Sequence, residues 1–312
     1  MTWVTWHQHR REALISLVFL AAIAIVLVYS GLQMRAFATT INLSLCAGTG
    51  PATSACGIAM QQFLSAFAPI GIFILQMLAV VPGLVGVFIG APLLARELEQ
   101  GTHLLAWTQT ITRTRWLVIK LALVAAATIV AGLATAQLAA WWWAPLAAGF
   151  SSSDWQAFEA IGVSPAAYGI FALGLGVAAG AIIRRTVPAM LVTTLGFAAS
   201  RLAVAHWLRP YYMPPMTGSM DPGAAGADDR GRLFIELFWA DASGHRVTND
   251  AVNKLVAEAS DPSTVLAQHG LHQLMLFQPA SRLVTFQLME AALFAGCGLA
   301  LLALAVWRAK RL

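Results

Sequence analysis

Six long apolar runs constrain this chain more than any other feature of its sequence. A helix that crosses a bilayer needs about 20 consecutive, mostly apolar residues. Runs of about this length or longer are Ala13–Ser30, Phe67–Ala95, Leu117–Ala140, Gly162–Ile183, Val187–Trp207 and Leu283–Trp307. Hydrophobic residues make up 59% of the chain and charged residues only 11%, whereas ordinary soluble domains have about 25% charged residues. The sequence therefore predicts an all-α polytopic membrane protein with six transmembrane helices.

The lysines and arginines of the short loops predict which side of the membrane each loop faces, because cytoplasmic loops carry an excess of them. One side of the predicted topology carries Arg10, Arg11, Arg96, Arg113, Arg115, Lys120, Arg184, Arg185, Arg308, Lys310 and Arg311. The opposite segments, 31–66 and 141–161, carry only Arg35. We therefore expect a plasma-membrane protein with both termini in the cytoplasm. The net charge of +5 then reflects topology and requires no nucleic-acid partner.

Two cysteines lie in the first predicted outer segment. Cys46 and Cys56 would face an oxidising compartment, where a disulfide bond persists. Closing so short a loop stabilises a chain by roughly 3 kcal/mol in the chain-entropy model. We predict a Cys46–Cys56 disulfide, with two free thiols as the alternative. Cys297, in the last span, is expected to be a small packing residue.

The segment 208–282 is the part of the chain that most resembles a soluble protein. It opens with a loop rich in proline and glycine, followed by a strand candidate at Leu233–Trp239 and a turn at Ser243–Gly244. An amphipathic helix is predicted over roughly 249–260, because its apolar residues recur at helical spacing. We expect this segment to form a small extracellular cap between the fifth and sixth transmembrane helices.

Motifs for catalysis and for metal binding are missing from the sequence. It contains neither the GxSxG pattern of hydrolases nor the GxxxxGK[ST] pattern of nucleotide-binding loops. His269 and His272 could share one helical face, with His245 upstream, but no familiar zinc spacing is completed. We therefore expect no catalytic residue, no metal site and no cofactor in this chain. Energy for any active transport would have to come from elsewhere.

Glycines and charges inside the spans suggest how the helices pack. Gly86 and Gly90, like Gly176 and Gly180, have the GxxxG spacing that is typical of close helix contacts.

Arg201 and Glu290 are the clear charged candidates within the predicted spans. In continuous helices both would lie near the outer boundary at a similar depth. A charge at that depth needs a partner or a water-filled cavity. The sequence therefore predicts an Arg201–Glu290 ion pair. Separate snorkelling to the headgroups and a role in a polar translocation path remain alternatives.

The charged loop Arg96–Lys120 separates two long apolar runs. Its residues Arg96, Glu99, Gln100 and His103 are three or four apart and would share one face of a helix. Gly101 and Thr102 could end this helix and cap the next. A solvated hairpin with basic membrane anchors is the plain alternative. The acidic residues Glu97 and Glu99, on a side where topology requires only basic residues, favour a surface that contacts a partner outside the bilayer.

Three stretches of the chain resemble one known family. In the loop they are Arg96–Glu97–x–Glu99–Gln100–Gly101–Thr102, then Thr108–Gln109 and Arg113–x–Arg115 with Lys120. They resemble the signature of permease subunits of type-2 ATP-binding-cassette (ABC) transporters, in particular the actinobacterial branch. The N-terminal residues 2–10 resemble the amphipathic elbow helix of that family, and residues 278–290 resemble the start of its last span. The departure is Leu283–Val284, where an aromatic residue would be expected.

The resemblance implies partners and a division of the chain. It implies a second permease copy, identical or related, and a separate pair of ATPase subunits that bind ATP and Mg²⁺ and drive export by alternating access. Residues 1–207 would hold the elbow, five spans and a coupling loop at 96–120, followed by the cap at 208–282 and the sixth span at 283–312. The ATPase-coupling residues would be Arg96, Glu97, Glu99, Gln100, Gly101, Thr102, His103, Arg113 and Arg115. No substrate is implied.

Two other classes of function remain open from the sequence. A secondary transporter would use intramembrane charges and broken helices, for which Arg201, Glu290 and the prolines Pro69, Pro82 and Pro188 are candidates. A membrane-embedded sensor or immunity protein would need no ATPase and could use the 208–282 cap as its receptor. Co-purification of an ATPase would distinguish a permease from both.

Overall fold

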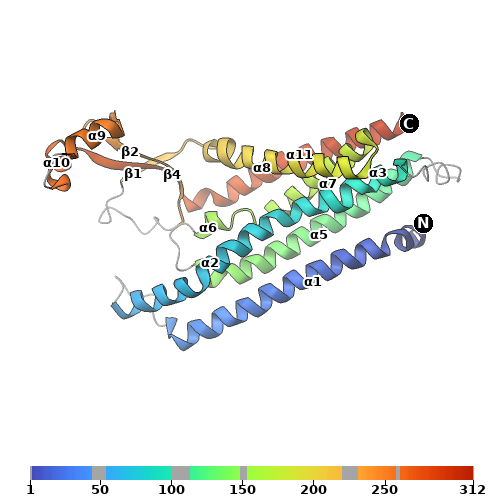
Figure 1. Ribbon diagram of the computed structural model, residues 1–312, viewed down its shortest axis with the longest axis horizontal. Helices are drawn as coiled ribbons and strands as arrows, with labels where there is room; N and C mark the ends of the chain where they lie inside the picture. Colours follow the sequence, from blue (N-terminus) through green and yellow to red (C-terminus); the bar gives the residue numbers. More distant parts are fainter. Residues whose placement is uncertain are drawn as a thin grey trace.

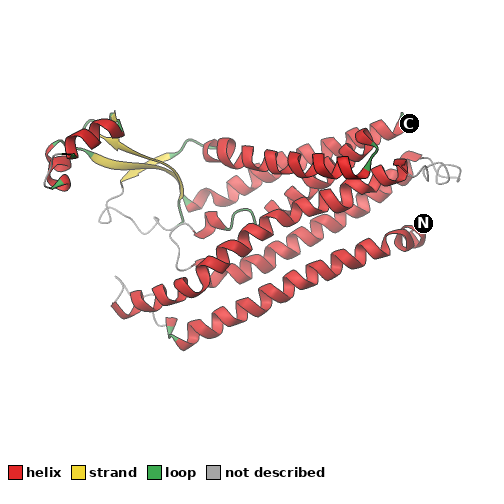
Figure 2. Cartoon of the chain, in the orientation of Figure 1, coloured by secondary structure: helices red, strands yellow, loops and turns green. Residues whose placement is uncertain are grey.

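The computed structural model describes residues 2–43, 54–99, 113–147, 153–219, 231–257 and 261–311. These form an elongated helical bundle with a small sheet-containing cap at one end (Figures 1 and 2). Both chain termini lie at the opposite end of the bundle (Figure 1). We refer to the two ends as the termini end and the cap end.

Six helical segments of the described residues are long and apolar enough to cross a membrane, which confirms the six predicted spans. The first three are α1 (Thr2–Thr40), α2 (Ser54–Val85) with η2 (Gly86–Gly90) and α3 (Ala91–Glu99), and α5 (Arg113–Ala147). The short helix α6 (Ser153–Gln156) follows. The last three spans are α7 (Ser164–Ile183), α8 (Thr186–Ala203) with η3 (Val204–Leu208) and η4 (Arg209–Tyr211), and η5 (Ala280–Arg282) with α11 (Leu283–Lys310).

The predicted elbow is joined directly to the first span. Residues 2–40 form one helix, so no loop separates the elbow from the span. That the N-terminal residues lie along a membrane interface stays a prediction.

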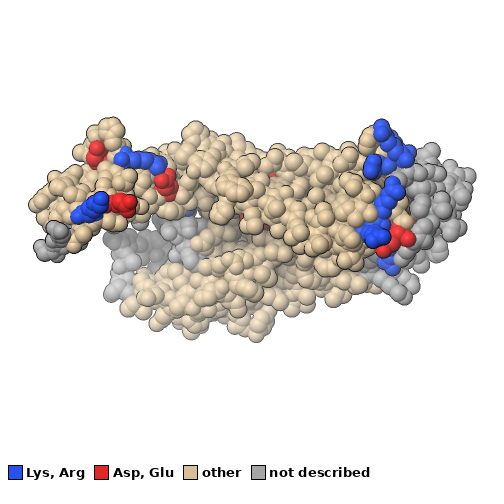
Figure 3. Space-filling model, turned by 45° about the horizontal axis from the view of Figure 1, so that its top comes forward, with Lys and Arg blue, Asp and Glu red and all other residues tan. Residues whose placement is uncertain are grey.

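Charged side chains gather at the two ends of the molecule, and the face seen in Figure 3 has a broad uncharged band between them. Large apolar side chains along α1 and α8 are exposed, among them Ile15, Val187 and Leu195. Because water would make this exposure unfavourable, the band is the surface that a multi-pass membrane protein presents to lipid.

Helix α7 lies inside the bundle. All but three of its 20 residues are buried, between α2, α3, α5, α8 and α11. Small residues allow this packing. A Cβ on Gly90 would lie 2.9 Å from the Leu173 carbonyl oxygen, and one on Gly180 would lie 2.6 Å from that of Ala91. The predicted GxxxG contacts are therefore confirmed as helix-packing contacts within the chain.

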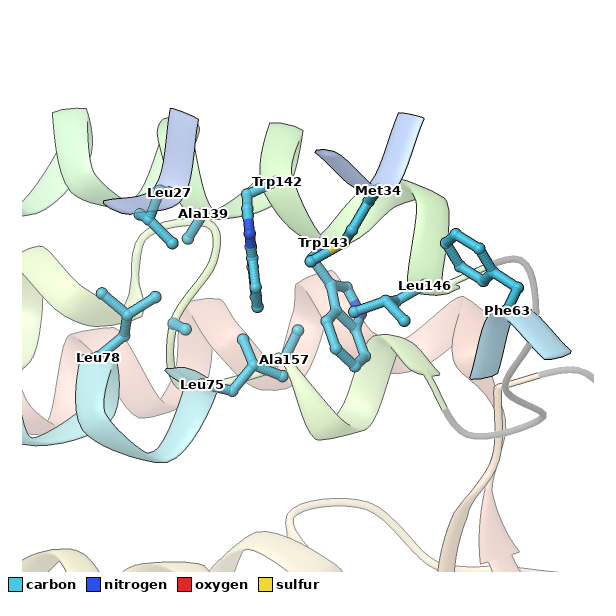
Figure 4. Packing of buried hydrophobic residues seen from close by; sticks show 11 residues of the cluster. Leu27, Met34, Phe63, Leu75, Leu78, Ala139, Trp142, Trp143, Leu146 and Ala157 are labelled. Carbon is cyan, nitrogen blue, oxygen red and sulfur yellow. The ribbon is translucent and has the colours of Figure 1, made fainter. Parts of the chain in front are cut away.

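Helix α1 packs at the edge of the bundle, mainly on α5. Trp142 Nε1 donates a hydrogen bond to Ser30 Oγ at 2.9 Å, and Arg35 Nη2 donates one to the Trp141 carbonyl oxygen at 2.7 Å. The shared core includes Leu27, Met34, Phe63, Leu75, Leu78, Ala139, Trp142, Trp143, Leu146 and Ala157 (Figure 4). Two buried tryptophans of α5 therefore fill the space between α1, α2 and α5.

The cap contains an antiparallel sheet in the order β1-β4-β2-β3, with two short helices. Its elements are β1 (Met216–Ser219), β2 (Leu233–Ala240), β3 (Arg246–Val247), α9 (Asn249–Val256), α10 (Pro262–Gln268) and β4 (His272–Gln278). The predicted strand appears as β2, the predicted turn joins β2 to β3, and the predicted helix appears as α9. The predicted all-α class holds for the bundle but is wrong for the cap, because β1 and β4 pair along their length and make a sheet.

The two chain connections to the cap are fixed to each other. Buried Gln278, at the end of β4, donates hydrogen bonds to the carbonyl oxygens of Pro210 at 3.0 Å and Met213 at 2.7 Å. Arg282 donates to the Pro214 carbonyl oxygen and to Gln278 Oε1, both at 2.8 Å. The cap is therefore held firmly to the ends of α8 and α11.

Of the predicted disulfide, one cysteine lies among the described residues. Cys56, near the start of α2, takes part in a disulfide bond. Cys297 is a free thiol and is exposed, so the prediction that it is a packing residue is wrong for this chain by itself. Cys46 lies outside the described residues, so the Cys46–Cys56 pairing stays a prediction.

Replacing Gly298 of α11 by alanine should destabilise the bundle by about 1–3 kcal/mol, the usual cost of overpacking an interior. The reason is that the added Cβ would lie 2.7 Å from the Ile170 carbonyl oxygen. Gly296 on the same helix is the matched control, because a Cβ there meets nothing within 4 Å. Gly296→Ala should be neutral, or stabilising by up to about 1 kcal/mol through helix propensity. Unfolding in detergent, followed by tryptophan fluorescence, measures both, and equal effects would contradict the packing argument.

Candidate functional site

Glu97 of α3 has a partner within the bundle. Lys120 Nζ of α5 lies 2.7 Å from Glu97 Oε1, and only 4% of the Lys120 side chain is exposed. The same ammonium lies 4.9 Å from the centre of the Trp116 ring. Because a buried ammonium without a carboxylate is costly, Glu97 stabilises the packing of α3 against α5.

Glu99, at the end of α3, caps another helix. Its Oε2 accepts hydrogen bonds from Thr186 N at 3.0 Å and from Thr186 Oγ1 at 2.7 Å. Thr186 is the first residue of α8, and the preceding residue, Arg185, provides no side-chain cap. A carboxylate satisfies the free N–H groups at a helix N-terminus and favours the positive end of the helix dipole. Glu99 therefore joins α3 to α8.

The predicted ATPase-coupling residues are only partly described. Arg96, Glu97 and Glu99 belong to α3 and Arg115 to α5. Gln100, Gly101, Thr102 and His103 lie outside the described residues, as does the side chain of Arg113. Their contact with an ATPase stays a prediction. Glu97 and Glu99 both have partners inside the chain, so their acidic character does not by itself indicate a partner outside the bilayer.

A second group of charges is buried near the cap end. Glu290 of α11 is fully buried, and Arg209 of η4 forms a two-pronged ion pair with it. Arg209 Nε lies 2.8 Å from Glu290 Oε2, and Arg209 Nη2 lies 2.8 Å from Oε1. Tyr168 of α7 donates a third hydrogen bond to Oε1 at 2.6 Å. This geometry is that of a strong, orientation-specific pair.

Glu159 extends this pair into a cluster. It lies between α6 and α7, where its Oε1 is 2.8 Å from Arg209 Nη2 and its Oε2 pairs with Arg201 Nη2 of α8. The Arg201 guanidinium also stacks on the Tyr168 ring, 3.4 Å from its centre. Burial alone would raise the pKa of Glu159, but the charges of Arg201 and Arg209 outweigh it and lower the pKa, so Glu159 is ionised at neutral pH. We call Glu159, Arg201, Arg209 and Glu290 the four-charge cluster.

The predicted Arg201–Glu290 ion pair is replaced by this arrangement. Both residues belong to the cluster, but Arg201 pairs with Glu159 and Glu290 pairs with Arg209. The fifth predicted span ends at Trp207, and Arg209 falls within the predicted cap. In the structure the helix continues through η3 and η4, so Arg209 reaches into the bundle.

A π-helical turn brings the two arginines to one side of the helix. Arg201 and Arg209 are eight residues apart, whereas two turns of an α-helix take up about 7.2 residues. The π-helical turn η3 lies between them and accommodates the additional residue. Both guanidinium groups therefore reach Glu159. A hydropathy pattern carries no signal for such a turn.

The histidines of the cap do not form a metal site in the described part of the chain. No three histidine, cysteine, aspartate or glutamate residues gather there in a way that could hold an ion. His272 belongs to strand β4 and His269 follows α10, so the predicted shared helical face is wrong.

A family model described as ABC-2 membrane transporter related matches residues 17–209, more than half of the chain. The chain belongs to this family. It is therefore a permease of the ABC-2 type. No curated protein and no solved structure matches it. The match ends at Arg209, so the cap and the last span of this permease lie beyond the matched residues.

Reversing the charge of Glu97 in this permease should destabilise it, because Lys120 would lose its carboxylate. We expect Glu97→Lys to cost about 2 kcal/mol, as for a hydrogen bond to a charged group. The swapped variant Glu97→Lys/Lys120→Glu restores an ion pair with the opposite polarity and should recover most of the loss. Thermal unfolding in detergent measures this recovery. Failure of the swap to recover any stability would contradict an internal role for Glu97.

Neutralising Glu290 should be more costly, because it leaves the buried Arg209 without its two-pronged partner. We expect Glu290→Gln to destabilise the permease by about 3–5 kcal/mol, the usual effect of breaking a buried ion pair. Glu236→Gln is the matched control, since Glu236 pairs with Arg246 at 2.8 Å on the exposed surface of the cap. That change should cost less than about 1 kcal/mol. Similar losses of stability in the two variants would contradict the prediction that burial makes the Glu290–Arg209 pair the more costly one to break.

Proposed function

We propose that this permease is the membrane-spanning subunit of an exporter driven by a separate pair of ATPase subunits. The family match carries the proposal, because the matched residues include the whole 96–120 loop and reach the fifth candidate span. On this proposal the termini end faces the cytoplasm, and a second permease copy, identical or related, completes the pathway. This chain hydrolyses nothing itself, and ATP with Mg²⁺ binds to the ATPase subunits.

The anchoring of α3 supports a role in force transmission. The 100–112 segment directly follows α3, and it contains four of the nine predicted ATPase-coupling residues. Glu97 ties α3 to α5, and Glu99 ties it to the first residue of α8. Gly90, just before α3, holds it close to the backbone of α7. A displacement of the segment after α3 would therefore move three other spans.

The four-charge cluster also fits a secondary transporter, in which buried carboxylates carry protons or ions. That mechanism requires no ATPase partner. The two functions therefore differ in what accompanies the chain when it is purified from its native membrane.

The test is co-purification of the tagged full chain from mildly solubilised native membranes. We expect a soluble ATPase subunit to accompany it and to hydrolyse ATP. Replacing Gln100, Thr102 and His103 by alanine should lower the recovered ATPase by about tenfold or more, as for loss of an interface hot spot.

Asn253→Ala/Lys254→Ala is the control, because it removes exposed polar side chains from α9 at the cap end. It should leave ATPase recovery unchanged. Purification of an active transporter without any ATPase would refute the proposal and favour the secondary transporter.

A further inference from the structure

The four-charge cluster is not explained by stability alone. Removing ions from water is costly, and well-packed apolar residues in place of a buried ion pair are often equally stable or more stable. Arg201 Nη1 is buried and lacks a hydrogen-bond partner among the described residues. Buried charges within a membrane span generally have a functional role. The arrangement of the cluster indicates what this role is.

The two carboxylates of the cluster are held differently. Glu290 is fully buried and accepts hydrogen bonds from Arg209 and Tyr168. Glu159 is the one member with substantial access to water, with 29% of its side chain exposed. Water can replace the partners of Glu159 as they separate, but it cannot do so for Glu290. Glu159 is therefore the contact that can be broken at the lower cost.

Glu159 lies on a short connection that covers one side of the cap end. This connection, residues 157–163, joins α6 to α7 and includes Gly162, which has a φ of +69°. Besides Glu159, it is fastened by Gln287 Nε2 of α11, which donates to the carbonyl oxygens of Phe158 and Ile161 at 3.1 Å each. The Arg209 guanidinium lies 4.3 Å from the centre of the Phe158 ring. The connection is thus held by side chains from α8, η4 and α11.

The sheet of the cap restricts which helices can move apart at the cap end. Strands β1 and β4 pair from Met216↔Phe277 onward, directly beyond the ends of η4 and α11. Gln278 and Arg282 fasten the same junction. Helices α8 and α11 therefore cannot separate from each other at this end without breaking the sheet. An opening between this helix pair and the 157–163 connection leaves the sheet intact, and it is crossed by the ion pairs of Glu159 and the hydrogen bonds of Gln287.

We propose that Glu159 is the releasable contact of a latch, and that its separation from Arg201 and Arg209 opens the cap end of the bundle during transport. Glu290 and Arg209 stay paired through the movement and keep α8 and α11 together. The link to transport rests on the proposed function. The latch itself is a property of this chain and is testable without an ATPase.

Hydrogen exchange of the full chain in lipid nanodiscs, measured by mass spectrometry, tests the latch. In Glu159→Gln, the amides of residues 157–163 and 209–215 should exchange about tenfold faster, the factor expected for losing a hydrogen bond to a charged group. Amides of α7 from Ile170 to Ala179 should be unchanged, because these residues lie in the buried interior. Glu236→Gln is the control and should alter neither region.

A double-mutant cycle of Glu159→Gln with Arg201→Met distinguishes a specific latch contact from a general loss of stability. Because Glu159 and Arg201 share one contact, the double variant should accelerate exchange by less than the product of the two single effects. In Glu159→Asp, which keeps the charge, the exchange rate should lie between those of the wild type and Glu159→Gln. If Glu159→Gln does not fold, Glu159→Asp takes its place in the test. Unchanged exchange at 157–163, equal acceleration throughout α7, or independent effects of the two substitutions would overturn the latch.

The role in transport has its own readout. In the purified complex with its ATPase, trapping with ATP and vanadate should accelerate exchange at 157–163 in the wild type. Unchanged exchange at 157–163 on trapping would show that the latch does not open during transport. That result would hold even if the double-variant experiment confirms the latch in the isolated chain. If no ATPase partner is found, the proposed function is refuted. The exchange experiments on the isolated chain would still decide whether the latch exists.

Discussion

The close approach of other helices to the backbone of α7 is the constraint on which the rest of the bundle depends. In a bilayer no hydrophobic force drives one helix against another, so association relies on close packing and hydrogen bonding. Small residues along α7 let η2 and α3 approach on one side and α11 on another. A larger side chain at Gly90 or Gly298 would meet backbone atoms, which cannot move aside as a flexible side chain can. The positions of α3, α8 and α11 relative to one another follow from this axis, and with them the contacts of Glu99 and of the four-charge cluster.

Helix α8 and its extension connect the polar contacts at the two ends of the bundle. At the termini end, Thr186 is capped by Glu99 of α3. At the cap end, Arg201 and Arg209 hold Glu159 and Glu290. The span of 26 residues, Thr186–Tyr211, is about 39 Å long if helical throughout. Many of its exposed residues are large and apolar, among them Val187, Leu191 and Leu195. Its contact with Glu99 lies at one end, and its ion pairs lie in the half nearer the cap. These contacts join α8 and its extension to α3 at one end and to α11 and the 157–163 connection toward the other.

The sequence predicted the spans well because hydropathy is a local signal. The ion pairs were predicted poorly because they depend on contacts between distant residues. Glu99 meets Thr186, 87 residues along the chain, and Glu290 meets Arg209, 81 residues away. Depth arguments placed Arg201 and Glu290 at one level and brought both into one cluster. They could not identify the partners, because Arg209 enters the bundle only through the π-helical turn that extends α8.

In the cap too, the sequence predicted the elements that have a local signal and missed those that depend on distant pairing. The apolar run Leu233–Trp239, the turn residues and the helical spacing of apolar residues identified β2, the turn that follows it and α9. Strands β1 and β4 escaped prediction because they form by pairing with each other across the whole cap. This pairing also decides how the cap can act. Because β1 continues from α8 and β4 leads into α11, a force on the cap moves both helices together. Such a movement would strain the contacts of Glu159 with the two arginines, since the 157–163 connection belongs to neither helix. The cap is therefore positioned to influence the latch through α8 and α11.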